Sequence, residues 1–254
     1  MKQAVYLLLI TAIAGSVFAE QQAPRRPTST LSAGAGLLIT DKPHKGGDTE
    51  IRPIPLIFYR VDRLVFTGLQ FSYYFIYEED MSLSLIGAPR FEGYDDDESR
   101  TLNGMHDRDG TYELGVDLSK SFDWGTVSLT ALTDVLGEHS GQEVQLQYER
   151  KLNNVLDVPS LDITPSIGIN WRSKQLNDYY YGVEGTEATP ARPEYHAGST
   201  VGVLAGLRLD YPVDEQWSLF SSFNIEWLGS EITDSPIVNE HTMTSFILGA
   251  MYRF

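Results

Sequence analysis

Five histidines carry the side chains best suited to acid–base chemistry in this 254-residue sequence: His44, His106, His139, His196 and His241. A histidine that a carboxylate orients is the general base of many hydrolases. His196 and His241 fit that role if the fold brings either of them beside Asp107 or Asp234. No local motif surrounds these residues and no serine stands out as a nucleophile, so solvated loop residues are the favoured interpretation. We therefore assign no catalytic residue and expect a protein that is not an enzyme.

A second chemical possibility is a cation site at the acidic run Asp95-Asp96-Asp97-Glu98. Carboxylates bind hard divalent cations, but this run lacks the spaced ligands and the glycine of a calcium-binding loop. A solvated, self-repelling loop explains the run better, so we expect no metal and no cofactor. The sequence has no cysteine, which excludes thiolate nucleophiles, Cys-ligated zinc and disulfides.

The aromatic run Tyr179-Tyr180-Tyr181 has two interpretations. The rings stack on sugars if they lie on an exposed loop. Alternatively, they extend a rim of interfacial aromatic residues that begins at Trp171. The sequence alone leaves both interpretations open.

The composition narrows the class of protein. Asp and Glu number 35 against 19 Lys and Arg, a formal net charge of -16, and phosphate recognition needs the opposite sign, so a nucleic-acid partner is not expected. Hydrophobic residues make up 42% of the chain, which is too few for a bundle of membrane helices.

The first residues have the pattern of a secretory signal. A charged start at Lys2 is followed by a short apolar run and by small residues that end at Ala19. The division expected is a signal peptide over 1–19, an irregular lead-in over 20–30 and a single β domain over 31–254.

From residue 31 onward the hydrophobic period is two, the repeat of a strand whose two faces meet different surroundings. Between Trp217 and Trp227 the odd positions are apolar except Ser221, and most even positions are polar. Ten steps at ~3.3 Å, tilted by about 40°, rise roughly 25 Å, the height of the apolar band of an outer-membrane barrel. The expected rim aromatics are Trp171, Tyr211, Trp217, Trp227 and Tyr252.

A soluble β-sandwich also alternates, but three features favour a barrel: the aromatic rims, the signal peptide and the last strand. The final amphipathic segment ends at Phe254 and resembles the assembly signal of bacterial outer-membrane barrels. The fold class expected is therefore all-β, an antiparallel transmembrane β-barrel in the bacterial outer membrane, in contact with lipid and lipopolysaccharide and inserted by the barrel-assembly machinery.

Eleven segments have strand character, whereas a single-chain bacterial barrel has an even number of strands. Splitting the segment 63–77 near Gly68 gives twelve strands, the preferred number, and fusing it with a neighbour gives ten. The segments are 31–40, 51–60, 63–77, 81–91, 110–120, 124–135, 142–151, 160–172, 197–211, 216–229 and 242–254.

The connections fall into two sets. Counting back from a periplasmic C-terminus assigns 92–109, 136–141, 173–196 and 230–241 to the cell exterior and the shorter 121–123, 152–159 and 212–215 to the periplasm. Pro53 and Pro55 remove hydrogen-bond donors from one edge of their strand. That edge is either a weakly paired seam or a bent strand.

Charges of both signs alternate with the lipid-facing positions and are expected to line the lumen. Unpaired burial of such groups would be costly, so they pair across strands or keep their water. Either a salt-bridged plug that stiffens the barrel or a narrow selective pore fits this pattern. The principal residues are Arg52, Arg60, Arg90, Glu92, Glu113, Asp117, Asp162, Arg172, Arg208, Asp210, Glu226 and Arg253.

An ordered set of short motifs resembles the MltA-interacting protein (MipA) / OmpV family of outer-membrane proteins. The motifs cover nearly all of the chain after the signal: Pro53-Ile54-Pro55, Leu102-Asn103-Gly104-Met105-His106-Asp107-Arg108, Tyr180-Tyr181-Gly182-Val183, Tyr195-His196-Ala197-Gly198, Asp234-Ser235-Pro236-Ile237-Val238 and Tyr252-Arg253-Phe254. The resemblance implies a barrel that acts as a scaffold between a lytic transglycosylase and a penicillin-binding protein. The charged lumen favours a different function, a narrow channel for small solutes, and a hydrolase on the rim is the third hypothesis. The oligomeric state is left open.

Overall fold

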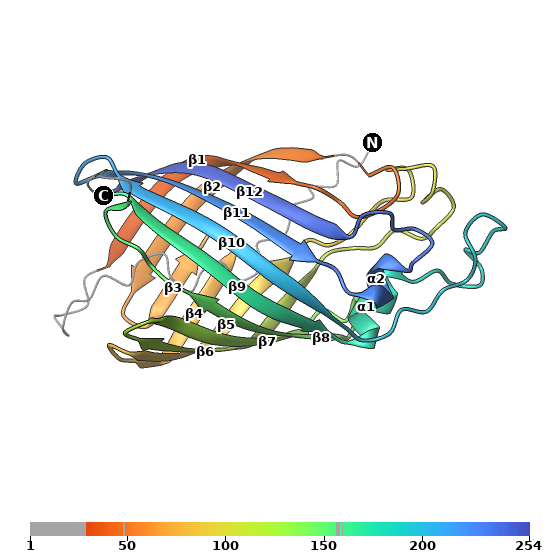
Figure 1. The fold of residues 1–254 in the computed structure, drawn as a ribbon, viewed down its shortest axis with the longest axis horizontal. Coiled ribbons are helices and arrows are strands. Elements are labelled where there is room, and N and C mark those ends of the chain that lie inside the picture. Colours follow the sequence, from red (N-terminus) through yellow and green to blue (C-terminus); the bar gives the residue numbers. More distant parts are fainter. Residues whose placement is uncertain (1–28, 48, 156–157, 159) are drawn as a thin grey trace.

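The computed structural model describes residues 29–47, 49–155, 158 and 160–254. The expected signal peptide, 1–19, lies outside the described residues, as does the expected lead-in up to residue 28. The described chain forms a closed antiparallel barrel in which each strand pairs with its sequence neighbours and β1 pairs with β12 (Figure 1).

Twelve strands make up this barrel, which confirms the preferred number. They are β1 (Thr30–Thr40), β2 (Glu50–Val61), β3 (Leu64–Thr67), β4 (Gln70–Tyr77), β5 (Met81–Arg90), β6 (Thr111–Phe122), β7 (Gly125–Asp134), β8 (Gln142–Glu149), β9 (Asp162–Arg172), β10 (Thr200–Pro212), β11 (Trp217–Trp227) and β12 (Thr242–Arg253). The split near Gly68 is also confirmed, because Gly68 adopts φ +62° in the turn that separates β3 from β4. Glycine takes this left-handed conformation without steric cost.

The two ends of the barrel differ in their connections. At one end, called here the loop end, lie the long connections that include helices α1 (Lys174–Tyr181) and α2 (Ser230–Thr233). The short turns and the C-terminus lie at the opposite end, the turn end (Figure 1). The loops assigned together from the sequence do share an end of the barrel. Neither helix is long, and no helix in the described part of the chain is long and apolar enough to cross a bilayer.

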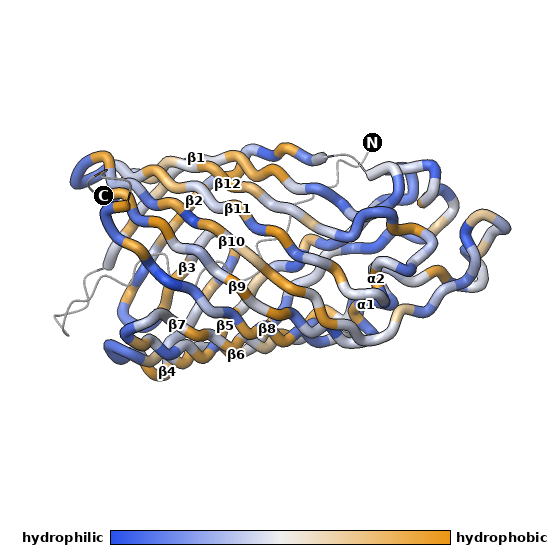
Figure 2. Tube along the Cα trace, in the orientation of Figure 1, coloured by the Kyte–Doolittle hydropathy of each residue, from blue (hydrophilic) through white to orange (hydrophobic). Residues whose placement is uncertain are grey.

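The two faces of the wall have opposite character. Outward side chains such as Ile167, Val201 and Leu248 are large, apolar and about half exposed, whereas inward neighbours such as Asn170 and Ser222 are polar and buried. Figure 2 shows this alternation as apolar and polar residues that follow one another along the strands. A sandwich would bury its apolar face, so hydrocarbon is the surrounding that these exposed side chains fit.

Pairing is incomplete on one side of β2. β1 pairs with β2 along its whole length, from Glu50 to Arg60, but β3 pairs with β2 only from Phe58 to Val61. Pro53 and Pro55 lie in the stretch whose other edge has no strand partner among the described residues. This confirms the seam interpretation of the two prolines.

Candidate functional site

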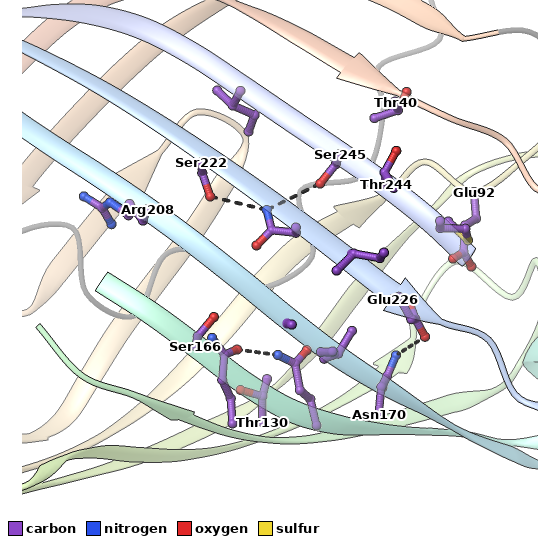
Figure 3. A pocket seen from close by; sticks show the side chains of 18 of the residues that line it. Thr40, Glu92, Thr130, Ser166, Asn170, Arg208, Ser222, Glu226, Thr244 and Ser245 are labelled. Atoms are coloured by element: carbon purple, nitrogen blue, oxygen red, sulfur yellow. Dashed lines mark hydrogen bonds between the residues drawn. The ribbon is translucent and has the colours of Figure 1, made fainter. Parts of the chain in front are cut away.

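The interior of the barrel holds a cavity that offers about 170 Å³ to the centres of water molecules. This is room for on the order of ten waters. Its wall from β6 to β9 is polar, with hydroxyl and amide side chains that include Ser128, Thr130, Gln145 and Ser166. Figure 3 shows part of this lining, with hydrogen bonds between neighbouring side chains such as Asn170 and Glu226.

The cavity is more accessible at the turn end than at the loop end. Inward side chains near the turns, such as Ser119, Thr126 and Glu149, are half-buried. Those near the loops, such as Glu143 and Arg172, are 2% and 1% exposed. Water therefore has less access to the lumen at the loop end of the barrel than at the turn end.

A network of buried charges forms this closed region, and Arg90 is its first centre. Its Nε lies 2.9 Å from Glu113, its Nη1 3.0 Å from Glu92 and its Nη2 2.7 Å from Glu143. The guanidinium group presents its donors in a fixed planar fork, which lets one arginine serve three carboxylates. His139 extends the network, with Nε2 3.5 Å from the Glu113 carboxylate.

Arg172 is the second centre and shares two carboxylates with the first. It lies 3.1 Å from Glu92, 3.5 Å from Glu143 and 2.8 Å from Glu226. The side chains of the two arginines are both 1% exposed. These contacts link β5, β6, β8, β9 and β11 across the polar side of the lumen, so these charges pair across strands.

Electrostatics keep Glu92 ionised. Burial alone would raise the pKa of the Glu92 carboxyl, but the guanidinium groups of Arg172 and Arg90 outweigh that effect and hold its pKa below the usual range. Glu92 is therefore a carboxylate that bridges the two arginines.

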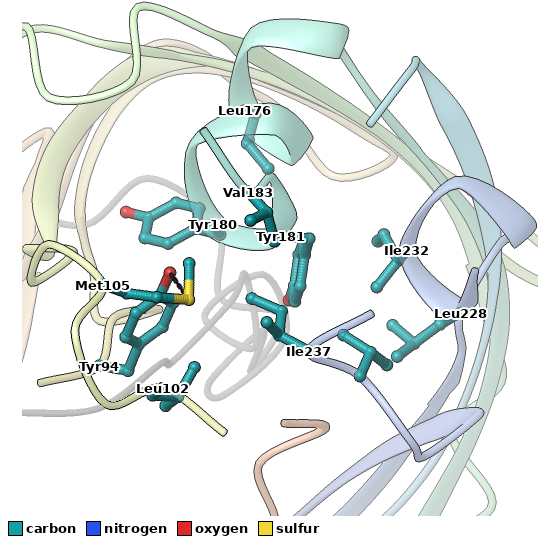
Figure 4. Close-up of a cluster of buried hydrophobic side chains, with 11 residues drawn as sticks. Tyr94, Leu102, Met105, Leu176, Tyr180, Tyr181, Val183, Leu228, Ile232 and Ile237 are labelled. Carbon is teal, nitrogen blue, oxygen red and sulfur yellow. Dashed lines mark hydrogen bonds between the residues drawn. The ribbon is translucent and has the colours of Figure 1, made fainter. Parts of the chain in front are cut away.

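An apolar cluster, called here the cap, covers the network at the loop end (Figure 4). Residues from three connections meet in it: Tyr94, Leu102, Met105, Leu176, Tyr180, Tyr181, Val183, Leu228, Ile232, Ile237 and Val238. The Oγ of Ser173 accepts a hydrogen bond from the backbone N–H of Leu176 and so begins α1. The same helix buries one face, which carries Leu176, Tyr180 and Tyr181.

Polar contacts fix the loops around the cap. Arg108 donates to both oxygens of Glu187, at 3.0 and 3.1 Å, and to the backbone oxygen of Tyr179. Burial would raise the pKa of Glu187, but hydrogen bonds from the backbone N–H groups of His106 and Glu184 and the nearby Arg108 lower it. The connection between β5 and β6 is thereby bound to the connection between β9 and β10.

His44, in the connection between β1 and β2, packs against the cap. Its ring stacks on Tyr181, with centroids 5.6 Å apart, and meets the edge of Tyr94 at 4.8 Å. Burial lowers its pKa from 6.5 to about 4, with Lys42 acting in the same direction, while the backbone oxygen of Tyr180 and the Glu92 carboxylate act against it.

Acid is therefore expected to loosen the cap. Because the pKa of His44 is lower in the closed state than in an open one, its stabilising contribution is complete above pH 6.5 and is lost as the pH falls toward 4. At a pH of about 5 the loss is about 2 kcal/mol. Hydrogen exchange of the loop backbone measures it, with faster exchange expected around Tyr94 and Tyr181. A His44→Gln variant should lose this pH dependence, and exchange that responds to pH equally in both proteins contradicts the assignment.

The structure places the predicted lumen residues in four settings. Arg90, Glu92, Glu113, Arg172 and Glu226 belong to the charge network, and Asp117 and Arg208 line the cavity. Four others pair locally: Arg52 with Glu50, Asp210 with Arg208, Asp162 with Lys151, and Arg60 over the ring of Tyr77. Arg253 is exposed at the turn end.

The histidines and the acidic run do not assemble the chemistry considered for them. His196 lies beside Glu194 and Asp178, at 3.2 and 3.4 Å, and no described contact joins it or His241 to Asp107 or Asp234. In the acidic run, Glu98 pairs with Lys42 at 2.6 Å. The described residues contain no group of three His, Asp or Glu arranged to hold a metal ion.

Both interpretations of the tyrosine run are wrong for Tyr180 and Tyr181. Each is 1% exposed and packs inside the cap, so neither ring is free to stack on a sugar or to reach the membrane interface. Tyr179 is only partly buried and packs against the cap. The helical spacing of Leu176, Tyr180 and Tyr181 could have indicated a helix with one buried face. It was missed because the segment was interpreted as a loop.

The predicted rim aromatics lie on the outer face. Trp171, Tyr211, Trp217 and Trp227 are 38 to 45% exposed, and Tyr252 packs edge-on against Trp217 with ring centroids 5.2 Å apart. Phe254 is 75% exposed, and its backbone N–H donates to the oxygen of Leu31.

Comparison with known proteins gives one family. Outer membrane protein Omp26La of Vibrio anguillarum is 34% identical over 157 residues, which are 62% of this chain but only 59% of that protein. The chain thus spans less than two thirds of this relative and, with the same 59%, of outer membrane protein OmpV of Vibrio cholerae. The MltA-interacting protein of Escherichia coli (strain K12) is 27% identical over 250 residues, which cover 97% of this chain and 96% of that one.

Among solved structures, an outer membrane channel from Pseudomonas putida F1 covers 93% of this chain and 98% of its own, with a TM-score of 0.45 and 13% identity. Residues 33–254 match the family model described as MltA-interacting protein MipA. That match covers nearly the whole barrel, and the relatives are named as outer membrane proteins. This chain is a β-barrel of the bacterial outer membrane and belongs to the MltA-interacting protein MipA family.

Proposed function

We propose that the protein is a non-conducting anchor in the outer membrane whose turn end docks a peptidoglycan-remodelling enzyme. The packing of the loop end supports the first half of this proposal: the cap covers the mouth, and the network of Arg90 and Arg172 narrows the lumen beneath it. A barrel closed in this way holds surfaces in place and does not pass solutes. No catalytic role is assigned to it.

The second half rests on family membership and on the charge of the turn end. A relative that matches 97% of this chain is named MltA-interacting protein, which suggests a lytic transglycosylase partner, with a penicillin-binding protein as the further enzyme of the scaffold. Arg63, Arg150 and Lys151 are exposed at the turn end, but acidic residues outnumber the basic ones there, which suits a partner with a basic surface. The exposed acidic residues include Glu78, Glu79, Asp80, Asp123, Asp214 and Glu215.

The expected route to this position uses the segments named from the sequence. Residues 1–19 would direct export, 20–30 would lead into the barrel, and the barrel-assembly machinery would read the last strand with Phe254. Once inserted, the exposed apolar belt would face lipid and lipopolysaccharide.

A retention experiment tests the docking. The barrel is immobilised in detergent and a purified lytic transglycosylase is passed over it at moderate salt. Replacing Glu78, Glu79 and Asp80 together by serine is expected to reduce retention several-fold. The matched control replaces Asp95, Asp96 and Asp97 at the loop end, which changes the net charge equally and should leave retention intact. No retention by the unmodified barrel, or equal loss in both triple variants, contradicts the proposal.

A narrow channel for small solutes is the second candidate. The polar wall of the cavity favours it, because Ser128, Gln145 and Ser166 suit hydrated solutes. This function requires the cap to move, since the mouth is closed by residues that are at most 9% exposed. Steady conductance of the unmodified barrel would favour the channel over the closed anchor.

A further inference from the structure

The wall of the barrel has a gap, and β2 forms its first border. The backbone oxygen of Ile57 accepts a hydrogen bond from Gly68 on the β3 side. Backbone groups alternate in direction along a strand, so Pro53 and Pro55 turn the same edge toward β3. Among the described residues, that edge has no strand partner before Ile57, and the two prolines leave it without two of its donors.

β5 forms the second border in the same way. Its pairing with β4 ends at Gly87, opposite Phe71. The backbone oxygen of Asp80 accepts from Ser121 on the β6 side, so odd-numbered residues of β5 face the opposite side. Pro89 therefore lacks its donor on the edge that faces the gap. Because proline has no backbone N–H, the prolines on both borders prevent a complete ladder of hydrogen bonds between them. The gap therefore follows from the sequence.

The outer side of the gap faces hydrocarbon. Ile51 and Ile57 on β2 are 63% and 48% exposed, and Leu69, in the turn that ends the gap, is 57% exposed. Backbone carbonyls without partners are costly in the hydrocarbon region of a bilayer. Other barrel strands avoid that cost by pairing, so an edge without a strand partner among the described residues points to an entrance from the bilayer.

Apolar side chains lie on the inner side of the gap. Leu38, Ile54 and Ile247 form a buried cluster, and Phe91, just after β5, packs against it. This apolar contact joins the two borders of the gap. Rotation of a few apolar side chains would open such a contact at a small energetic cost.

The apolar cluster opens onto the cavity, which gives the lumen two unlike walls. Phe91 and Ile247 belong to both the cluster and the cavity lining, whereas the facing wall carries Ser128, Thr130 and Gln145. Glycine keeps the apolar wall flat, because a Cβ at Gly249 would lie 2.6 Å from Leu56 and 2.9 Å from Phe220. An apolar wall offers nothing to the solutes of a water-filled pore, whereas an amphiphile can place its hydrocarbon chain against it.

We infer that the cavity binds a single-chain amphiphile with a small polar head, such as a fatty acid, which enters from the bilayer between β2 and β5. Its chain lies against Phe91 and Ile247, and its head meets the hydroxyl and amide groups opposite. The closed cap leaves the lateral gap as the entrance that hydrocarbon can reach. This site is independent of the docking proposed for the turn end.

Photolabelling tests the site and the route separately. The full barrel is reconstituted in phosphatidylcholine vesicles with palmitate that carries a diazirine on its chain, and labelled residues are located by mass spectrometry. The expected labels include inward positions around Phe91 and Ile247, and unlabelled palmitate should suppress them. Labels confined to outward residues such as Leu248 would overturn the proposal.

The route is tested by bridging the gap after folding. The chain has no cysteine, so a Pro53→Cys, Pro89→Cys double variant can be joined across the gap with bismaleimide reagents of graded length. Bridging is expected to reduce inward labelling several-fold relative to the same variant left open. The matched control, Leu129→Cys with Leu146→Cys, joins two outward residues that are paired across β7 and β8 and should change nothing. Inward labelling that persists after the gap is bridged would overturn lateral entry.

Discussion

Replacing Arg90 by alanine is expected to lower the free energy of unfolding by about 3–5 kcal/mol. The substitution leaves Glu92, Glu113 and Glu143 buried, with Arg172 as the remaining guanidinium. Like charges held close together in a region of low dielectric repel strongly, and the carboxylates must either take up protons or draw in water. An Arg90→Lys variant should recover only part of the loss, because a single ammonium group cannot reach three carboxylates in plane.

Urea unfolding in lipid vesicles measures this loss, followed by the tryptophan fluorescence of the barrel. Arg208→Ala is the matched control: Arg208 also faces the lumen, but its partner Asp210 has a side chain that is 31% exposed. Water can replace the missing guanidinium there, so the control should lose about 1 kcal/mol or less. Equal midpoints for the Arg90→Ala variant and the unmodified protein would show that the network contributes no stability.

Removing the cap is expected to open the mouth of the barrel. Excision of residues 174–196, with Ser173 joined to Ala197 through a short glycine-serine link, deletes α1 and the part of the cap that it carries. The underlying strands keep their pairing, because β9 ends at Arg172 and β10 begins at Thr200. Vesicles that contain this variant should swell in a small sugar, whereas vesicles with the unmodified barrel should swell only at the background rate.

A milder variant separates opening from misfolding. Tyr180→Ser with Tyr181→Ser removes two buried rings from the cap and retains the whole backbone, and each truncation is expected to cost about 3–5 kcal/mol of local packing. The control changes Glu184 and Glu194 to serine, since both side chains lie on the same segment but are more than half exposed. Background swelling in the two cap variants, with correctly folded barrels, would mean that the charge network alone blocks the lumen.

The architecture of the wall could be predicted because period-two alternation is a local property. Each outward residue, from Ile167 on β9 to Leu248 on β12, meets the same surroundings as the next outward residue of its strand. The strand count depended on Gly68, whose freedom to adopt positive φ separates β3 from β4. Pro53 and Pro55 indicated a weakly paired edge as one of two interpretations, because a missing hydrogen-bond donor is visible in the sequence itself.

The contents of the mouth could not be predicted in the same way. Arg90 and Glu143 meet only because β5, β6, β7 and β8 pair in one register. The sequence of a single strand does not determine that register. The cap depends on contacts between connections that are far apart in the sequence, such as Tyr94 with His44. The two tyrosines of α1 were interpreted as surface aromatics because a loop was expected where an eight-residue helix forms.

The closure of the loop end is the claim on which the proposed anchor role depends, and single-channel recording tests it most directly. The unmodified barrel, inserted into a planar lipid bilayer at neutral pH, is predicted to give no current steps above those of the protein-free membrane, because the cap and the charge network of Arg90 and Arg172 block the lumen. Stable conductance steps from the unmodified protein would contradict a closed barrel.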